Sequence, residues 1–590
     1  MQHQVETGQR TRLLQVTRKP PGRVVIEGVT PEVDGGRFPA KRIIGDNVVV
    51  EADIFADGHD SLAGALLYRH ESDADWKQVS LEPLVNDRWR GSFRVDRLGR
   101  YRYTLRAWMA SDPSGVTQYE KELLLIVDRE KARFSAWYEI FPRSWGTTPG
   151  RHATFRDVET HLPRIASMGF DVLYLAPIHP IARARRKGKN NAGTAGPQDP
   201  GSPWGIGARE GGHKAIHPEL GTLEDFRRFV AKAKEVGLEV ALDVAFQCSP
   251  DHPYVREHPE WFRRRPDGSI QHAENPPKKY EDIYPLNFET PNGQALWEEL
   301  KSIFFFWIAQ GVRIFRVDNP HAKPFAFWEW VIGQIKEKHP DAIFLSEAFT
   351  RPKIMVRLAK LGFSQSYTYF AWRNTRWELT DYFTELTKGL AREFFRPSLW
   401  PNTPDILTEY LQKGGPPAFR VRLILAATLA AGYGIYGPAF ELCENKPLEP
   451  GSEEYLNSEK YEIKRWNLED PRSLKDLVGR VNRIRRENRA LQQNDGLEFH
   501  AVDNEQLLCY SKRDPEAANC ILTVVNLDPR NSQSGWVDLR PEVLGLQPGR
   551  PIELEDLLTG KRYSWQGSRS FVQLDPASAP AHIFRMGKAG

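Results

Sequence analysis

A repeating order of apolar strand, loop and helix begins at Phe134 and restricts the folds open to this chain. Eight segments have the length and the apolar content of buried strands: Ala136–Phe141, Asp171–Ile178, Glu239–Phe246, Val312–Val317, Ile343–Ala348, Tyr367–Trp372, Ser398–Trp400 and Tyr433–Tyr436. Helical periods such as Leu223–Glu235 and Phe325–Lys338 lie between several of them. This alternation predicts a (β/α)8 barrel over residues 131–492 rather than a doubly wound sheet.

Strand-like segments without long helices flank this barrel. Residues 23–130 contain runs such as Gly99–Trp108, in which apolar and polar residues alternate, separated by Gly- and Asp-rich turns. They predict an N-terminal, immunoglobulin-like β-sandwich, preceded by a flexible, polar lead-in at residues 1–22. Runs such as Leu507–Lys512 predict a second β-sandwich over residues 493–590.

Two connections inside the barrel are unusually long and are rich in Gly, Pro and charged residues. They span residues 179–220 and 248–295, and each follows a predicted strand. Loops of this length in a compact domain are usually functional. Both leave carboxyl ends of strands, the face where barrel enzymes carry their chemistry, and we expect them to shield a reaction from water.

Charge and hydropathy argue against several classes of protein. The formal net charge of the 590 residues is only +4 and the charges are interspersed, so nucleic-acid binding is not expected, although the basic run Arg183–Lys189 taken alone allows that interpretation. No apolar run has membrane-spanning length, and the first residues lack the core of a signal peptide. The four cysteines have no metal-ligand spacing, which favours reduced thiols in a cytoplasmic protein.

A carboxylate lies at or after the carboxyl end of three of the predicted strands. Arg316 and Asp318 are two residues apart and so lie on the same side of one strand, Glu347 ends the next strand, and Asp405 follows a later one. Two carboxylates on one barrel face are what glycosidic bond cleavage requires, one as nucleophile and one as proton donor. Each has a plainer interpretation: Arg316 and Asp318 could form a structural salt bridge, and Glu347 could be a satisfied buried acid.

Taken together and in this order, the three acids resemble the signature regions of the α-amylase superfamily of glycoside hydrolases and transferases. The resemblance implies that Asp318 is the nucleophile, Glu347 the general acid/base, Asp405 the acid that stabilises the transition state, and Arg316 the residue that keeps the nucleophile ionised. The third predicted strand contains the motif Leu242-Asp243-Val-Ala, in which the resemblance implies a structural role for Asp243.

Two departures from the hydrolytic amylases are informative. Those enzymes usually carry Asn-His after the third strand and His-Asp at the last catalytic aspartate, whereas this chain has Gln247-Cys248 and Pro404-Asp405. The missing Asn is a typical calcium ligand, so we expect no metal ion and no cofactor. The missing histidines make an ordinary amylase a poor fit.

Four longer motifs resemble a narrower family, the α-1,4-glucan:maltose-1-phosphate maltosyltransferases. They are Val-Asp-Asn-Pro-His-Ala-Lys-Pro-Phe-Ala-Phe-Trp-Glu-Trp from Val317, Asn-Pro-Pro-Lys-Lys-Tyr-Glu-Asp-Ile-Tyr from Asn275, Asn-Thr-Pro-Asp-Ile-Leu from Asn402 and Tyr-Gly-Ile-Tyr-Gly from Tyr433. The resemblance implies a retaining transferase that moves a maltosyl unit from α-maltose 1-phosphate to the non-reducing 4-hydroxyl of an α-1,4-glucan and releases phosphate. Donor-binding positions carry over to Lys187, Gln247, Asn275, Lys278, Tyr280, Asp282, Asn319, Lys460 and Tyr461.

The loop after the third strand agrees with a phosphorylated donor. Asn275, Lys278, Lys279 and Tyr280 cluster positive charge and hydrogen-bond donors, which could hold an anionic leaving group. The plainer interpretation is a solvated basic loop. The alternative function is an α-amylase or 4-α-glucanotransferase that acts without phosphate, and a rival of another class is a non-catalytic glucan-binding protein on the same scaffold.

One expected element is missing. Members of this family typically carry a helical insertion within or just after the first sandwich, and it contributes to their dimer. Here Tyr101–Trp108 is followed directly by Ser111-Asp-Pro-Ser-Gly and another strand-like run. The resemblance still allows a homodimer, but without the usual contact surface.

Overall fold

The computed structural model describes residues 23–587 except 276–277, 515, 517 and 546–549. The chain divides into two units, one of residues up to 126 without 41–44, and one of residues 127–590 together with 41–44. No helix in the described ranges combines the length and the apolar character that crossing a membrane demands.

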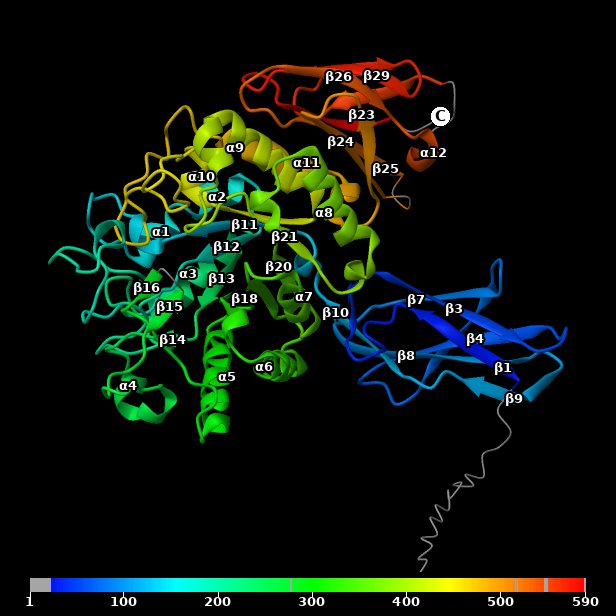
Figure 1. Ribbon diagram of the computed structural model, residues 1–590, viewed down its shortest axis with the longest axis horizontal. Helices are drawn as coiled ribbons and strands as arrows, with labels where there is room; N and C mark the ends of the chain where they lie inside the picture. The colour runs from blue at the N-terminus through cyan, green and yellow to red at the C-terminus, as the bar shows by residue number, and fades with distance from the viewer. Residues whose placement is uncertain (1–22, 276–277, 515, 517, 546–549, 588–590) are drawn as a thin grey trace, which may run out of the picture. The chain divides into compact units, whose positions relative to one another are not determined.

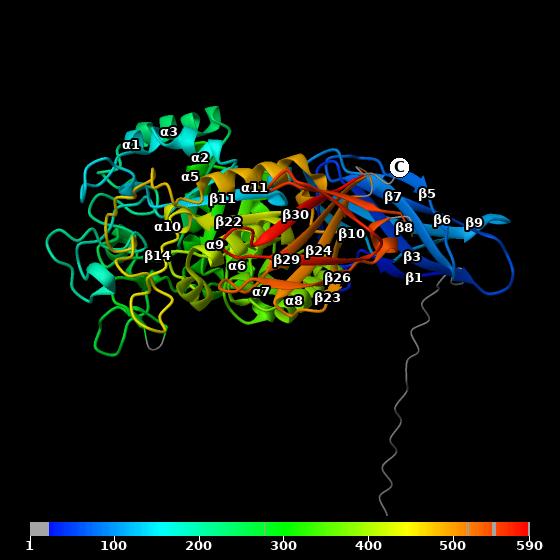
Figure 2. The ribbon, with the colours of Figure 1, turned by 90° about the horizontal axis from the view of Figure 1, so that it is seen from above.

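The first unit is built from antiparallel strands in two layers (Figure 2). One sheet has the order β1-β3-β7-β6, and the other has the order β2-β10-β8-β4-β5 with β9 paired to β8. The bounds are β1 Val24–Thr30, β2 Ala40–Ile43, β3 Asn47–Ala56, β4 Leu62–His70, β5 Lys77–Ser80, β6 Glu82–Pro83, β7 Arg88–Arg94, β8 Gly99–Met109, β9 Asp112–Gln118 and β10 Leu123–Asp128. Alternate residues of β3, such as Val48, Val50 and Ala52, are buried between the layers.

The expected absence of a helical insertion is visible here. Met109 at the end of β8 pairs with Asp112 at the start of β9, so a tight hairpin joins the two strands. The described residues 23–128 contain no helix.

The second unit contains a closed barrel of eight parallel strands, which confirms the predicted barrel (Figure 1). In spatial and chain order they are β11 Ser135–Ile140, β12 Val172–Leu175, β13 Glu239–Val244, β18 Ile314–Asp318, β19 Ile343–Glu347, β20 Gln365–Tyr367, β21 Pro397–Leu399 and β22 Gly432–Tyr436. Bulky rings from different strands fill the interior, including Trp137, Tyr174, Tyr367 and Trp400. The barrel is therefore a packed core whose chemistry is confined to its rim.

Helices surround these strands, as Figure 1 shows. They are α1 Phe155–Glu159, α2 Leu162–Ser167, α3 Leu223–Glu235, α5 Gly293–Ala309, α6 Phe325–Lys338, α7 Pro352–Lys360, α8 Arg376–Lys388, α9 Glu409–Leu429, α10 Gly437–Glu441 and α11 Lys475–Glu487. Helix α3 begins at a capping box, because Thr222 accepts from the Asp225 backbone and Asp225 reaches back to the Thr222 backbone.

One predicted strand is partly wrong. The segment Tyr367–Trp372 leaves the sheet at Tyr367, and residues Tyr369–Trp372 form a 3-10 helix. The Thr368 side chain accepts from the Phe370 backbone and caps this turn. A local side-chain hydrogen bond therefore ends the strand where the apolar run continues.

The long connections carry small elements of their own. Residues 179–220 hold a 3-10 turn at Lys189–Asn191 and a bridge between Ile181 and Ile206. The second connection holds α4 Pro253–Glu257 and two short ladders, β14 Gln247–Cys248 with β17 Tyr284–Pro285 and β15 Ala273–Asn275 with β16 Lys278–Tyr280.

The C-terminal region is one antiparallel sheet of eight strands folded around one core. Its order is β28-β27-β30-β25-β24-β23-β26-β29. The bounds are β23 Leu497–Val502, β24 Leu507–Asp514, β25 Asn519–Asn526, β26 Gln533–Asp538, β27 Ile552–Asp556, β28 Arg562–Trp565, β29 Arg569–Leu574 and β30 Ala581–Met586, with α12 Pro541–Leu544 between β26 and β27. A hydrogen bond of 2.6 Å between Thr428 of α9 and Tyr510 of β24 ties this sheet to the barrel helices.

Gly434 tests how tightly the barrel core is packed. A Cβ atom at Gly434 would lie 2.3 Å from the Trp400 ring. We therefore expect Gly434→Ala to lower the free energy of unfolding by about 1–3 kcal/mol, the usual effect of overpacking. Urea unfolding followed by tryptophan fluorescence measures it.

The matched control is Gly479→Ala on helix α11, where the nearest atom to an added Cβ is 3.8 Å away. It should be neutral or stabilising by up to about 1 kcal/mol, because alanine favours a helix over glycine. Equal unfolding midpoints for the two variants would contradict the packing described for the barrel interior.

Candidate active site

The predicted catalytic residues meet at the carboxyl ends of neighbouring barrel strands. Parallel pairing places Asp318 of β18 opposite Glu347 of β19, and Asp243 of β13 opposite Arg316. All four are nearly buried, with exposed fractions between 2% for Asp243 and 8% for Glu347. Burial concentrates four ionisable groups in a medium where their interactions are strong.

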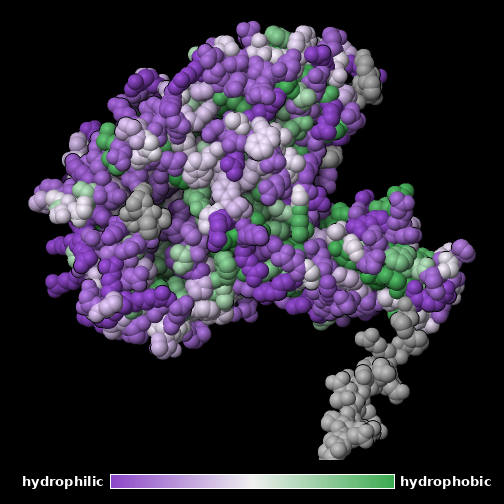
Figure 3. All heavy atoms as spheres, in the orientation of Figure 1, coloured by the Kyte–Doolittle hydropathy of each residue, from purple (hydrophilic) through white to green (hydrophobic). Residues whose placement is uncertain are grey.

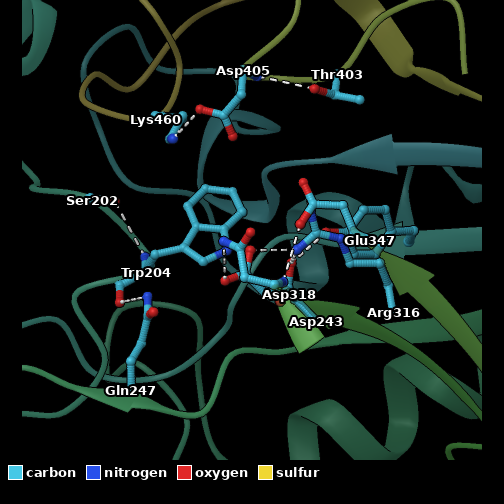
Figure 4. Close-up of polar contacts among 12 residues, drawn as sticks. Ser202, Trp204, Asp243, Gln247, Arg316, Asp318, Glu347, Thr403, Asp405 and Lys460 are labelled. Carbon is cyan, nitrogen blue, oxygen red and sulfur yellow. Dashed lines mark hydrogen bonds and ion pairs between the residues drawn. The ribbon is translucent and has the colours of Figure 1, made fainter. Parts of the chain in front are cut away.

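The Arg316 guanidinium contacts three carboxylates at once (Figure 4). Its Nη1 donates to Asp243 Oδ2 at 3.0 Å and to Asp318 Oδ1 at 2.8 Å. Its Nη2 lies 3.1 Å from Glu347 Oε1. The salt bridge that the sequence allowed as a plainer interpretation is therefore present, and it lies within the carboxylate cluster.

Asn319 adds a second link between Asp318 and Glu347. Its backbone is left-handed, with φ 43° and ψ 52°. Its N–H donates to Glu347 Oε2 at 3.2 Å, and its Nδ2 donates to Asp318 Oδ2 at 3.3 Å. Asparagine tolerates this conformation better than most residues, so it can terminate the strand and still hold both acids.

The surroundings of Glu347 favour its protonated form. Burial raises the pKa of Glu347 to about 8; Arg316 opposes this rise, and the charges of Asp318 and Asp405 add to it. Burial also raises the pKa of Asp243, again against Arg316. At neutral pH, Glu347 is therefore suited to donate a proton.

Asp405 lies on the loop after β21 and forms an ion pair with Lys460. Its side chain is 49% exposed, so it is the most accessible of the three predicted acids. The Lys460 ammonium lies 5.1 Å from the centre of the Trp204 ring. In Figure 4 the indole of Trp204 lies between the Asp405–Lys460 pair and Asp318.

Other predicted donor-binding residues surround this group. Gln247 Nε2 donates to the Trp204 carbonyl at 3.1 Å. Lys187, Asp282 and Tyr461 are 7%, 4% and 6% exposed. Burial raises the pKa of Asp282, while Lys187 and Lys460 oppose the rise, so these charges lie within electrostatic reach of one another.

The predicted basic loop forms the β15–β16 hairpin, in which Asn275 pairs with Lys278. The side chains of Asn275 and Lys278 lie outside the described part of the structure. Tyr280 contributes to the raised pKa of Lys460: burial opposes that rise, and Asp405 is its main cause. The hairpin end at Tyr280 is therefore close to the Asp405–Lys460 pair.

Sequence reasoning missed three residues of this pocket. Trp204 belongs to the long 179–220 connection, where Pro203 and Gly205 flank it. Glu139 is a 1% exposed acid in the otherwise apolar strand β11, and burial raises its pKa well above the usual range. Lys323 donates to the backbone carbonyls of Asp318 and Asn319 at 3.3 Å and 3.2 Å. The acid inside an apolar strand was a readable signal, because buried charges need a reason.

Among the described residues, one His/Glu group has the spacing to be considered for a metal ion, and it is not part of the carboxylate cluster. His152, His217 and Glu219 place ligand atoms within 4.8 Å of one another. The two imidazoles are stacked, with centroids 4.7 Å apart and planes 7° apart. Their lone pairs therefore lie in two nearly parallel planes and cannot both point at one ion, as tetrahedral coordination requires.

The barrel and its cluster of acids define a carbohydrate-active enzyme of the α-amylase type. The α-amylase catalytic-domain model matches residues 139–308. The fold is similar to the noncanonic maltogenic α-amylase AmyB from Thermotoga neapolitana, with a TM-score of 0.59, 20% identity, and coverage of 77% of this chain and 99% of that chain. It is also similar to an α-amylase from Geobacillus thermoleovorans, with a TM-score of 0.60, 15% identity, and coverage of 77% and 99%.

Matches to the flanking regions and to the whole chain identify a narrower family than the barrel does. Residues 22–123 match the model of α-1,4-glucan:maltose-1-phosphate maltosyltransferase, domain N/S, and residues 499–586 match the GLGE C-terminal model. Maltosyltransferases of this name from Methylacidiphilum infernorum and Chlorobaculum tepidum are 50% and 49% identical, each over 96% of this chain and 96% of the relative. The chain belongs to the α-1,4-glucan:maltose-1-phosphate maltosyltransferase family.

The same alignments bear on the missing insertion. They extend over 643 and 646 positions, although this chain has only 590 residues. The relatives therefore contain segments that this chain lacks, in agreement with the tight β8–β9 hairpin.

Removing Arg316 should leave three buried acids without their shared cation. We expect Arg316→Met to lower the free energy of unfolding by about 3–5 kcal/mol at pH 8. The loss should be smaller at pH 5.5, because without Arg316 the pKa values of Glu347 and Asp243 rise further, and the folded state is favoured while these two acids remain protonated. Urea unfolding at both pH values measures the difference.

The control is Arg585→Met, which breaks a pair with Glu555 whose side chains are 44% and 33% exposed. Exposed pairs contribute about 0–1 kcal/mol, so little change is expected at either pH. A loss at Arg316 no larger than this control would contradict its role as the shared counter-ion.

Proposed function

We propose that this protein transfers a maltosyl unit from α-maltose 1-phosphate to the non-reducing 4-hydroxyl of an α-1,4-glucan, with retention of configuration. The family supports the choice of donor and acceptor. The observation that carries the mechanism is the pair of acids, Asp318 and Glu347, which are joined by both Arg316 and Asn319.

The spacing of the acids favours retention. Asp318 and Glu347 are paired residues of β18 and β19, and the two terminal nitrogens of Arg316 contact their carboxyl groups at 2.8 Å and 3.1 Å, so the carboxyl groups lie close together. Retaining enzymes hold their carboxyl groups about 5–5.5 Å apart, whereas inverting enzymes need about 6.5–9.5 Å to admit a water. A double displacement through a covalent intermediate therefore fits this pocket.

In the first step, Asp318 attacks the anomeric carbon of the donor while the phosphate departs. Arg316 pairs with the attacking carboxylate and orients it, and Glu347 gives its proton to the leaving oxygen. The product is a β-linked maltosyl-enzyme and free phosphate. Glu347 has the raised pKa that this acid role needs.

In the second step, Glu347 takes the proton of the acceptor 4-hydroxyl, whose oxygen attacks the anomeric carbon and releases Asp318. Two inversions give the α-linkage. We assign the exclusion of water from the intermediate to the buried Trp204 and to the long connection that carries it.

The remaining residues are assigned by position. Asp405 and Lys460 bind donor hydroxyls, with Tyr461, Asp282, Lys187 and Gln247 around them. Asn275, Lys278 and Tyr280 on the β15–β16 hairpin hold the departing phosphate, because that hairpin combines positive charge and donors beside Lys460. A homodimer stays a prediction; the β8–β9 hairpin leaves it without the helical contact of its relatives.

Phosphate dependence tests the reaction. With maltohexaose and inorganic phosphate, the reverse reaction should release maltose 1-phosphate, measured by chromatography of the sugar phosphates. Asp318→Ala should lower this rate by at least about 10³-fold, the scale expected when a nucleophile is removed.

Asp341→Asn is the control. Asp341 precedes β19 and pairs with Arg313, which precedes β18, so this pair lies at the amino ends of the two strands whose carboxyl ends carry Asp318 and Glu347. The variant should retain the parental rate. Sugar products that form equally well without phosphate would support the amylase or glucanotransferase alternative. Unchanged turnover in Asp318→Ala would contradict the mechanism, and binding of glucan without any turnover would support the non-catalytic rival.

The pH dependence tests the assignment of Glu347. Because the free enzyme must carry the proton on Glu347, kcat/KM for maltose 1-phosphate should fall as pH rises through about 8. Initial rates of phosphate release between pH 6 and pH 10 measure it.

Glu347→Gln should lower kcat by about 10²–10⁴-fold and abolish this alkaline limb, because the amide has no proton to lose in this range. Asp341→Asn again serves as the control, with the parental profile. An alkaline limb that survives in Glu347→Gln would assign the titration to another group.

A further inference from the structure

We propose that Trp536 and Phe571 form a second glucan-binding site on the outer face of the C-terminal sheet. The site shares no residue with the catalytic pocket. It rests on the proposed function only in its choice of ligand, an α-1,4-linked glucan chain.

The two side chains are neighbours on the last two strands of this sheet. Trp536 of β26 and Phe571 of β29 are directly opposed in the antiparallel register, and β29 is the edge strand. Their rings lie 5.5 Å apart at an interplanar angle of 64°. Strand alternation turns Val537 and Val572 into the core and turns both rings outward.

Both rings are exposed far more than aromatic side chains usually are. Trp536 is 43% exposed and Phe571 is 53% exposed. The core does not depend on them, because the buried cluster of this region is formed by the inward residues of the same strands. Large exposed apolar groups that are adjacent mark binding surfaces more often than scattered single ones do.

The chemistry of the patch matches a sugar chain. One face of a pyranose ring is lined by C–H groups and packs on an aromatic ring, while its hydroxyls need polar partners at the edges. The Arg569 guanidinium lies over one face of the Trp536 ring, 5.4 Å from its centre, and forms ion pairs with Asp538 at 3.6 Å and Asp503 at 4.0 Å. Outward residues beside the rings, Ser534 and Gln573, supply further polar groups.

The angle between the rings selects among sugar chains. Two coplanar rings would suit a flat, extended chain, whereas rings tilted by 64° suit one that turns at each linkage. An α-1,4-glucan curves in this way. The patch therefore favours the polymer on which the catalytic pocket is proposed to act.

The size of the patch argues against a protein partner. With about 150–250 Å² per aromatic side chain, the two rings expose roughly 200 Å². A stable protein interface buries about 800 Å² on each partner. In Figure 3 the surface over β26 and β29, at the top of the view, is mostly hydrophilic with small hydrophobic areas.

A second site would change how the enzyme uses long acceptors. A polymer held at the sheet keeps its other ends at a high local concentration near the barrel, whereas a short oligosaccharide cannot occupy both sites. Loss of the patch should therefore weaken the use of glycogen and leave the use of maltohexaose unchanged.

The experiment compares Trp536→Ala and Phe571→Ala with the parent protein. The control is Leu390→Ala, because Leu390 is 51% exposed and lies on the 3-10 helix Leu390–Glu393, outside the patch. Native electrophoresis in gels containing glycogen measures binding. Initial rates of phosphate release with glycogen and with maltohexaose as acceptors measure the consequence.

We expect glycogen to retard the parent and Leu390→Ala, and to retard both patch variants much less. Their KM for glycogen should rise severalfold, with KM and kcat for maltohexaose at parental values. Trp536→Tyr, which keeps a ring, should retain most of the binding. Retardation of both folded patch variants equal to the parent would overturn the proposal, as would a changed oligomeric state with unchanged retardation.

A measurement on the parent protein covers the case in which a variant fails to fold. Maltoheptaose should slow amide exchange in the peptide that contains β29, and absence of that protection would equally overturn the proposal. Failure of the proposed function is distinguished separately, because release of maltose 1-phosphate from maltohexaose does not involve this patch.

Discussion

The contact between Arg316 and three carboxylates is the interaction on which the rest of the site depends. Asp243, Asp318 and Glu347 come from three adjacent strands, and the guanidinium contacts all three at 2.8–3.1 Å. Without it, the pKa values of Glu347 and Asp243, which burial already raises against the effect of Arg316, would rise further. The ion pair and the proposed catalytic arrangement are thus formed by the same contacts.

Much of this centre is predictable because strand geometry is regular. A spacing of two residues places Arg316 and Asp318 on one side of β18, and parallel register places Glu347 beside Asp318. Asn319 shows where the prediction ends. The resemblance identifies Asn319 as a donor-binding candidate. Its left-handed backbone and its hydrogen bonds to both acids depend on how the chain turns at the end of β18, which strand periodicity does not predict.

Loop residues were harder to anticipate for a related reason. Trp204 reaches the pocket from a connection of some forty residues, whose path is fixed by contacts distant in sequence, such as the Gln247 bond to its carbonyl. Likewise the strand predicted over Tyr367–Trp372 ends early because Thr368 caps a local turn. The periodicity of apolar residues predicts helices and strands, whereas single hydrogen bonds determine where these elements end and how long loops fold back to the pocket.

The charges of the pocket bear on how the proposed phosphorylated donor is held. Arg316 and Lys460 are already engaged by acids, Arg316 by three and Lys460 by Asp405. A phosphate that brings up to two negative charges beside Asp318 and Asp405 would meet repulsion from both. The proposal therefore assigns the phosphate to cations of the loops, among them Lys187, which acts on Asp282, and those of the β15–β16 hairpin, whose Tyr280 lies near Lys460. In this proposal the loops bind the phosphate, while the barrel strands carry the acids and Arg316.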